Sequence, residues 1–299
     1  MPVLLNEAVA GLAVRAGGRY IDGTLGLGGH AEAILAAGGT VLGIDADPEA
    51  LTLAGERLAP YGDHFRAERG NFREMEDIAA RAGFAPVAGV LLDLGLSSLQ
   101  LSERGRGFAF RWDRPLDMRM DPALPVSAAD IVNGWDEEAL ANAIYRFGEE
   151  RRSRAVARAI VRGRPVAGTA ELARIVERAV GRAAGHIHPA TRTFQGLRIA
   201  VNGELDALAA ALRAAHDLLE APGGRLAVIS YHSLEDRIVK DFVRRESRDC
   251  VCPPEAPGCV CDHIATLRPV TRRAVVPAPE EIGANPRARS AKLRVAERL

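Results

Sequence analysis

Strand-like and helix-like segments alternate from residue 19 to residue 95, and this alternation constrains the fold more than any other feature of the sequence. The predicted strands cover residues 19–24, 40–47, 64–72 and 87–95. The predicted helices between them cover residues 30–38, 48–59 and 73–83. The last strand, VAGVLLDLG, is almost continuously apolar, which is typical of a strand buried on both faces of a parallel sheet. The alternation therefore predicts a doubly wound α/β sheet with right-handed crossovers.

This alternation then stops. A loop rich in Arg, Gly and Pro at 102–125 leads into a series of helical patterns without a convincing strand-like run. The run RLAVISYH at 225–232 resumes the sheet and is followed by another helical pattern. We therefore expect a discontinuous sheet domain, residues 1–104 and 203–299, interrupted by a helical domain, residues 105–202.

The formal charge of the chain is balanced, with 39 Lys and Arg residues against 39 Asp and Glu residues. This excludes a wholly cationic nucleic-acid-binding protein, so any contact with RNA must come from local patches. With 47% hydrophobic residues, the chain can bury a core without cross-links. The apolar stretch from Leu4 to Val14 is too short to span a membrane, and no basic-then-apolar signal precedes it. We expect a soluble, cytoplasmic protein with no membrane partner.

A glycine-rich turn joins the first predicted strand to the first predicted helix. From Gly26 to Ala31 it satisfies the G-x-G-x-x-G/A pattern of nucleotide-binding loops, and Asp45 ends the next strand nineteen residues after Gly26. The pattern fits a nicotinamide dinucleotide and S-adenosylmethionine equally well. Asp22, four residues before Gly26, favours the methyl donor, because a carboxylate repels a pyrophosphate but binds an α-ammonium group. The alternative is that Asp22 only caps its own turn.

Two more side chains are predicted at the carboxyl ends of strands, where ligands bind in open parallel sheets. Phe72 ends the third predicted strand and Asp93 lies at the end of the fourth. Asp93 is expected to face the reacting centre, because an acid that ends the most apolar strand is costly to bury without a partner. The Phe72 ring could pack on an adenine, although core packing explains it equally well.

Ten blocks spread over nearly the whole chain stand in the order of one protein family. They are VLLNEAV, YIDGTLGLGGH, GIDADP, LLDLGLSS, RGFAF, PLDMRMDP, GEERRSRAVARAIV, HPATRTFQGLRI, ISYHSLEDRIVK and NPRARSAKLRVAE. With them the chain resembles the MraW, or RsmH, family, methyltransferases that act on the N4 amine of a cytidine in 16S ribosomal RNA. The resemblance implies a class I (Rossmann-like) methyltransferase sheet with an inserted helical domain, and S-adenosylmethionine as the cofactor. It implies 16S rRNA, at the decoding region, or the small ribosomal subunit as the partner; a homodimer is a further expectation.

The resemblance also implies a set of cofactor contacts in this chain. They fall on Gly28, Gly29, His30, Asp45, Phe72, Asp93 and Gln100. Family members often carry Phe and Arg where this chain has Leu25 and Leu27. Contacts made by the backbone of the loop do not depend on those side chains.

Methylation of an exocyclic amine needs a group that accepts hydrogen bonds from the amine and a path for the released proton. Asp93, at the end of the fourth strand, is our first candidate for this catalytic role. His232, which follows the strand at 225–230, could also accept the proton or contact RNA. The alternative is that Ser233 caps the following helix and His232 is structural. Tyr231 could stack on a flipped base, although core packing is the commoner role for such a residue.

The helical domain is expected to hold the RNA. Its best candidates are four arginines at helical spacing on one face: Arg151, Arg154, Arg158 and Arg162. Such a face could contact phosphates or simply be solvated. The segment from Arg268 to Leu299 is a second basic candidate.

The four cysteines form two Cys-x-Cys pairs: Cys250, Cys252, Cys259 and Cys261. Four thiolates could bind one structural zinc ion, with no coordination position left open. Because Cys-x-Cys is tighter than the usual Cys-x-x-Cys, reduced thiols and local disulfides are alternatives. The clustering does not resemble a scattered disulfide framework and so favours a reduced compartment.

Two other classes of function stay open from the residues alone. A nicotinamide-dinucleotide oxidoreductase would have to tolerate Asp22 beside a pyrophosphate. A non-catalytic RNA-binding module would bind RNA without transferring a methyl group. The family resemblance favours the methyltransferase over both.

Overall fold

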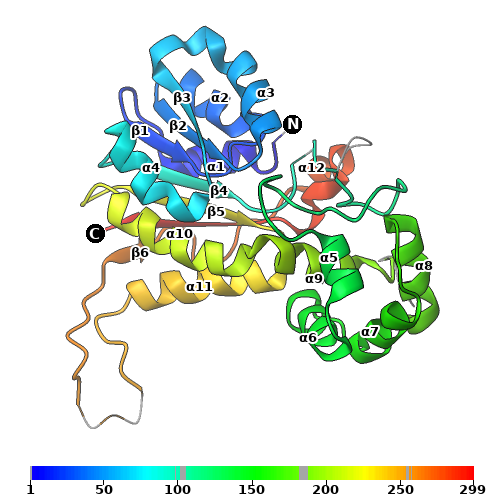
Figure 1. The fold of residues 1–299 in the computed structure, drawn as a ribbon. Coiled ribbons are helices and arrows are strands. Elements are labelled where there is room, and N and C mark those ends of the chain that lie inside the picture. Colours follow the sequence, from blue (N-terminus) through cyan, green and yellow to red (C-terminus); the bar gives the residue numbers. More distant parts are fainter. Residues whose placement is uncertain (1, 98, 102–105, 182–187, 254–255, 257) are drawn as a thin grey trace. The chain divides into compact units, whose positions relative to one another are not determined.

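Figure 1 shows the computed structural model of the chain. The structure describes residues 2–97, 99–101, 106–181, 188–253, 256 and 258–299. The chain folds into two compact units, which we call the sheet unit (Met1–Gly95 and Leu205–Leu299) and the helical unit (Leu96–Glu204). It thus leaves the sheet unit at Gly95, ahead of the expected boundary at 105.

The sheet unit is built on one seven-stranded sheet with the order β3-β2-β1-β4-β5-β7-β6. The strands are β1 (Arg19–Asp22), β2 (Thr40–Asp45), β3 (Phe65–Arg69), β4 (Gly89–Asp93), β5 (Arg225–Ser230), β6 (Leu267–Pro269) and β7 (Lys292–Arg298). Strands β1 to β5 pair in parallel, and β7 pairs antiparallel with β5 and β6. The predicted doubly wound sheet is confirmed. Its order reverses between β1 and β4, so their carboxyl ends flank the point where ligands bind in such sheets.

Helices cover both faces of this sheet. They are α1 (Leu5–Leu12), α2 (Gly29–Ala36), α3 (Pro48–Leu58), α4 (Met75–Ala82), α10 (Glu204–Leu218), α11 (Ser233–Glu246) and α12 (Pro279–Ala284), with short 3-10 turns η1 (Ala59–His64), η2 (Phe72–Glu74) and η3 (Pro286–Ser290). One buried cluster joins the sheet to α4, α10 and α11, and a second joins it to α1, α2 and α3. In β4, Val90 and Leu92 belong to the first cluster and Leu91 to the second. Since successive side chains of a strand point to opposite faces, this apolar strand needs helices on both sides.

The third strand is shorter than predicted. It ends at Arg69, and Phe72 begins η2 instead of ending a strand. The cause is Asn71, whose side chain accepts a hydrogen bond from the Arg73 N–H (3.1 Å) and caps the turn. Side chains of this kind compete with strand pairing by satisfying the local backbone, which the apolar pattern alone did not reveal.

The helical unit contains α5 (Ala128–Gly134), α6 (Glu137–Gly148), α7 (Ser153–Arg162), α8 (Thr169–Val180) and α9 (Thr191–Asn202), and its described residues form no named strand. It has its own buried cluster, which draws residues from all five helices and from the loop before them. Helices α6 and α9 approach closely at Gly148, where a Cβ atom would lie 2.3 Å from the Arg192 carbonyl oxygen. Among the described helices of both units, none is long and apolar enough to cross a membrane.

Candidate functional site

The loop between β1 and α2 is fixed to the carboxyl end of β2. The Leu25 N–H donates to the Ile44 carbonyl (3.0 Å), and the Gly26 N–H donates to the Asp45 carboxylate (2.7 Å). Gly26 and Gly28 have φ values of 52° and 75°, in the left-handed region that favours glycine. Gly28 is the N-cap of α2, so the loop brings the N-terminus of that helix to the edge of the sheet.

Two of the predicted cofactor contacts are glycines for reasons internal to the protein. A Cβ atom on Gly28 would lie 2.9 Å from Leu58 Cδ1, and one on Gly29 would lie 2.4 Å from Pro2 Cγ. Both positions therefore need glycine with or without a ligand. The glycine pattern therefore locates the loop at the sheet edge, and the side chains around the loop indicate which ligand it can hold.

Three carboxylates lie at the same edge of the sheet: Asp22 ends β1, Asp45 ends β2 and Asp93 ends β4. Asp22 is 1% exposed and accepts a hydrogen bond from the Thr24 N–H (3.2 Å). The Thr24 hydroxyl in turn accepts from the Asp93 N–H (2.6 Å), which ties the end of β4 to the glycine loop. Adjacent strands thus bring all three acids to the switch point of the sheet.

Burial disfavours the ionised form of these acids. It raises the pKa of Asp22 to about 6 and that of Asp93 to about 7, against an ordinary value of 3.8. It also raises the pKa of Asp45, although hydrogen bonds from the backbone of Asp47 and Gly26 oppose the shift. A cationic ligand at this edge would favour the ionised carboxylates, whereas an anionic ligand would add to the cost of burying them.

His30, in the first turn of α2, lies against this group of acids. Its Nε2 is 3.0 Å from the Val3 carbonyl, so Nε2 carries the proton and donates. Its Nδ1 is 3.6 Å from Asp93 Oδ2. Burial lowers the pKa of His30, which favours the neutral ring. A neutral His30 therefore presents an unprotonated Nδ1 to the Asp93 carboxyl group.

Tyr231 supplies a contact that the sequence reasoning missed. Its hydroxyl donates to Asp93 Oδ1 at 2.8 Å. Burial, and next Asp93 itself, raises the pKa of Tyr231, so the phenol stays a donor. The signal lay in the pairing of strands: Asp93 stands opposite Ile229, so Tyr231 emerges from β5 at the same edge. Tyr231 therefore orients Asp93.

His232 is engaged in capping α11. It is the N-cap residue, and its Nδ1 accepts a hydrogen bond from the Glu235 N–H (3.4 Å). The buried Glu235 carboxylate accepts in return from the N–H groups of Tyr231 (2.8 Å) and His232 (3.3 Å). The cap that the structural alternative placed at Ser233 is made by His232. This geometry favours the structural alternative for the histidine.

The last two predicted contacts differ in position. Phe72 is partly buried against the cluster that joins the sheet to α4, α10 and α11. It also lies close to Gly23: a Cβ atom added to Gly23 would be 3.5 Å from the Phe72 Cβ. It therefore lies beside the start of the glycine loop. Gln100 belongs to the helical unit, is 7% exposed, and accepts a hydrogen bond from the Ser97 N–H (2.9 Å).

Comparison with known proteins decides the family. A model of the MraW methylase family matches residues 1–299, which is the whole chain. The chain belongs to this family. A protein named ribosomal RNA small subunit methyltransferase H from Dehalococcoides mccartyi is 55% identical over 302 residues, covering 100% of this chain and 86% of that protein. Proteins of the same name from Thermomicrobium roseum and Carboxydothermus hydrogenoformans are 53% and 50% identical, covering 100% of this chain and 93% and 97% of theirs.

Membership of the MraW methylase family confirms the resemblance carried by the ten sequence blocks. The glycine loop and the three acids lie in three of these blocks: YIDGTLGLGGH, GIDADP and LLDLGLSS. Of the two cofactors that the loop pattern allowed, family membership favours the methyl donor.

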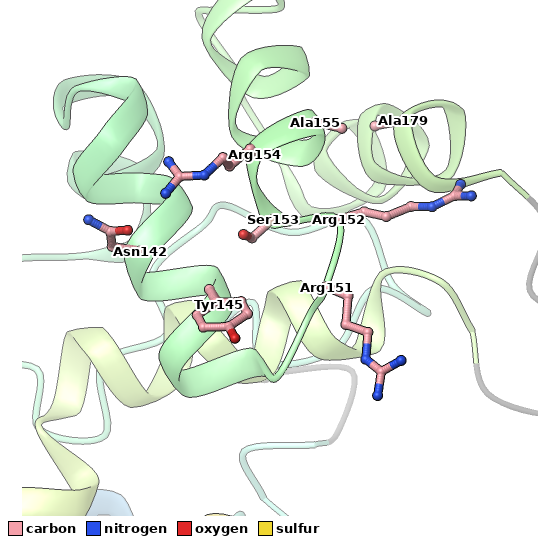
Figure 2. A pocket seen from close by; sticks show the side chains of 8 residues that line it. All are labelled: Asn142, Tyr145, Arg151, Arg152, Ser153, Arg154, Ala155 and Ala179. Atoms are coloured by element: carbon pink, nitrogen blue, oxygen red, sulfur yellow. The ribbon is translucent and has the colours of Figure 1, made fainter.

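The helical unit of this MraW-family chain contains a pocket of about 470 Å³ between α6, α7 and α8 (Figure 2). Its lining is formed by Asn142, Tyr145, Arg151, Arg152, Ser153, Arg154, Ala155 and Ala179. The four arginines predicted to share one helical face therefore have different surroundings. Arg151 and Arg154 line the pocket, whereas Arg158 Nε lies 3.4 Å from a Glu137 carboxylate oxygen.

Polar groups in this pocket lack partners among the residues that the structure describes. Arg151 and Arg154 are exposed and make no hydrogen bond or ion pair there, whereas Arg152 donates to the Val180 carbonyl (2.7 Å). Ser153 is 4% exposed, yet its hydroxyl also has no hydrogen-bond partner in the described part of the chain. Figure 2 shows this side chain between Arg154 and Tyr145. The pocket thus combines two exposed guanidinium groups with a hydroxyl at the N-terminus of α7, all without a partner among the described residues.

Proposed function

We propose that this chain transfers a methyl group from S-adenosylmethionine to the N4 amine of a cytidine in the decoding region of 16S ribosomal RNA. The observation that carries the proposal is the set of carboxylates around the glycine loop, in a chain of the MraW methylase family. The relatives named as ribosomal RNA small subunit methyltransferases support the RNA substrate.

S-adenosylmethionine fits the donor set at this edge of the sheet. Its sulfonium and α-ammonium groups are cationic, and Asp22, Asp45 and Asp93 bring three carboxylates together. We assign the ammonium to Asp22 and the ribose hydroxyls to Asp45. A dinucleotide would instead place its pyrophosphate beside buried acids, which is unfavourable. The other proposed contacts are Gly28, Gly29, His30, Phe72 and Gln100.

The cofactor supplies an electrophilic methyl group, and the protein must present the amine. The lone pair of the cytosine N4 atom is delocalised into the ring. An acceptor must therefore take hydrogen bonds from the amine N–H groups while that lone pair localises on the nitrogen. Asp93 is suited to this role. Thr24 and Tyr231 hold it in place, and its pKa, about 7 in the ligand-free protein, leaves a carboxylate that can accept a proton near neutral pH once a cationic cofactor favours its ionised form. We therefore assign the N4 proton to Asp93 and assign His232 to the cap of α11.

We assign RNA recognition to the helical unit, at the pocket lined by Arg151, Ser153 and Arg154. Guanidinium groups, a hydroxyl and a helix N-terminus are the usual donors to phosphate oxygens. Tyr145 is 59% exposed at the rim and offers a ring on which a base can stack. A nucleotide held by its phosphate and base would satisfy the groups that lack partners within the described chain.

The central experiment supplies labelled S-adenosylmethionine with small ribosomal subunits or with naked 16S RNA, and maps the methylated nucleotide. We expect label at N4 of one cytidine with wild-type protein and none with Asp93→Ala. Bound cofactor without incorporation into either RNA substrate would reject the enzyme and leave an RNA-binding module. Stabilisation by a nicotinamide dinucleotide, but not by S-adenosylmethionine, would support the oxidoreductase instead.

The pocket is tested by RNA binding with a matched control on the same helix. Arg151→Ala/Arg154→Ala should weaken binding of the RNA substrate about tenfold or more and reduce its dependence on salt. Arg162→Ala removes one exposed arginine of α7 outside the pocket lining and should have a much smaller effect. Because the control removes one charge and the pocket variant two, a control loss of half the free energy or more would indicate a diffuse basic surface and not a site.

A further inference from the structure

The segment from 247 to 266, between α11 and β6, has no hydrophobic core of its own. None of its described residues is buried, and Figure 1 shows it extending away from the sheet. Its base is closed by the Thr266 N–H, which donates to the Glu246 carbonyl (2.7 Å), and by the Ala265 N–H, which donates to Asp249 (3.2 Å). Beyond that base, no buried apolar side chain among its described residues holds the segment in its conformation.

The four cysteine sulfurs gather in this segment. All lie within 4.8 Å of one another. Sγ of Cys259 is 3.6 Å from that of Cys261, which is 3.8 Å from that of Cys250. These separations exceed the bond length of a disulfide, about 2.05 Å. They match the edge of a tetrahedron whose corners lie about 2.3 Å from a central zinc ion, which is about 3.8 Å.

The backbone supports this arrangement of sulfurs reciprocally. The N–H of Val251, between the first two cysteines, donates to Cys261 Sγ (3.4 Å). The N–H of Val260, between the last two, donates to Cys252 Sγ (3.4 Å). Each Cys-x-Cys turn thus donates one hydrogen bond to a sulfur of the other turn. Such bonds stabilise thiolates and orient metal ligands.

We propose that Cys250, Cys252, Cys259 and Cys261 bind one zinc ion as thiolates, their protons passing to solvent. The geometry, not the spacing, carries this inference, because four sulfurs within 4.8 Å of one another, two of whose separations match a tetrahedral edge, form a complete ligand set. With no open coordination position, the ion is structural: it replaces the missing core of the 247–266 segment. This proposal does not depend on the methyl-transfer assignment.

The test uses the full-length protein purified without a histidine tag and under reducing conditions, with metal content measured by mass spectrometry. We expect about one zinc ion per chain in the wild type and loss of nearly all of it in Cys252→Ser/Cys259→Ser. His263→Ala is the matched control: it removes a neighbouring metal-binding side chain that is not in the sulfur cluster and should keep the ion. Limited proteolysis should cut the 247–266 segment about tenfold faster in the double variant, because it removes the only proposed cross-link there.

Three results would overturn the proposal. One is wild-type protein that lacks stoichiometric zinc even after exposure to zinc chloride, or that holds iron in its place. Another is a double variant that retains both the zinc and the resistance to proteolysis. Detection of disulfides among these cysteines in the protein purified under reducing conditions would have the same meaning. Thermal stabilisation by S-adenosylmethionine, measured on the same samples, reports separately on the sheet edge.

Discussion

At the scale of single residues, burial and a hydrogen bond shift the pKa of Asp93 in opposite directions. Burial raises its pKa, and the hydrogen bond from the Tyr231 hydroxyl lowers it, with a net value of about 7. The hydroxyl therefore does more than fix the position of the carboxylate. It keeps the acid ionised at a pH where burial alone would protonate it.

Tyr231→Phe should shift the acidic limb of the transfer rate to higher pH. The proposed acceptor works in its ionised form, so activity rises as pH increases through the pKa of Asp93. Loss of the hydrogen bond raises that pKa, so the limb should move upward by about one unit, the equivalent of about 1.4 kcal/mol. Rates measured from pH 5 to 9 with saturating RNA and cofactor test this. A lower rate with an unmoved limb would mean that Tyr231 only supports packing.

Asp22→Asn should separate stability from cofactor binding. An acid whose pKa is raised in the folded state, here to about 6, costs stability as pH rises from about 4 to about 6, and the cost persists above that. Asparagine avoids this cost and keeps the acceptor for the Thr24 N–H, so the free protein should gain up to about 3 kcal/mol at pH 8 and little at pH 4. Its stabilisation by S-adenosylmethionine should disappear.

The measurement for Asp22 is chemical unfolding at pH 4 and pH 8, with and without cofactor. Asp77→Asn, which removes an exposed carboxylate from the first turn of α4, controls for the change in net charge: it should leave cofactor binding unchanged and should lower stability slightly at pH 8 instead of raising it. If Asp22→Asn bound S-adenosylmethionine as tightly as the wild type, the ammonium would have to be assigned elsewhere.

At the scale of elements, the start of α11 shows how one residue can suggest two roles. His232→Ala should destabilise the protein by about 1 kcal/mol through loss of the cap, whereas His232→Ser should keep both the cap and the stability. Because we assign the proton to Asp93, transfer per folded molecule should be near normal in both variants. If the His232→Ser protein were stable but transferred the methyl group about 100-fold more slowly, His232 would have a catalytic role.

The elements with a clear hydrophobic period were predictable, and the contacts between them were less so. The apolar run of β4 and the strand-loop-helix pattern around Gly26 predicted a sheet edge with Asp22, Asp45 and Asp93, which the structure brings together. The bond between Tyr231 and Asp93 joins residues 138 apart and depends on the pairing of β4 with β5. Local periodicity carries no information on that register. Phe72 shows the opposite case, because a single asparagine before it ended the strand early.

At the scale of the whole molecule, each unit has its own buried core. The two clusters of the sheet unit contain only residues from that unit, and the cluster of the helical unit draws only on residues from 96 to 204. A unit that buries its own apolar surface can fold without the other. The division of the chain therefore also divides the proposed functions, with cofactor binding on the sheet unit and RNA binding on the helical unit.

This division predicts that replacing 96–204 by a flexible Gly-Ser linker leaves a folded sheet unit. The shortened protein should still be stabilised by S-adenosylmethionine, because Asp22, Asp45 and the glycine loop remain, but it should neither bind nor methylate RNA. The replacement also removes Gln100, a proposed cofactor contact. Gln100→Ala in the full-length chain is therefore the control for any loss of cofactor affinity in the shortened protein. If the two proteins lose equal affinity, Gln100 accounts for the helical unit's share of cofactor binding. RNA binding that survives the replacement would contradict the assignment to the pocket and direct attention to the basic segment from Arg268 to Leu299.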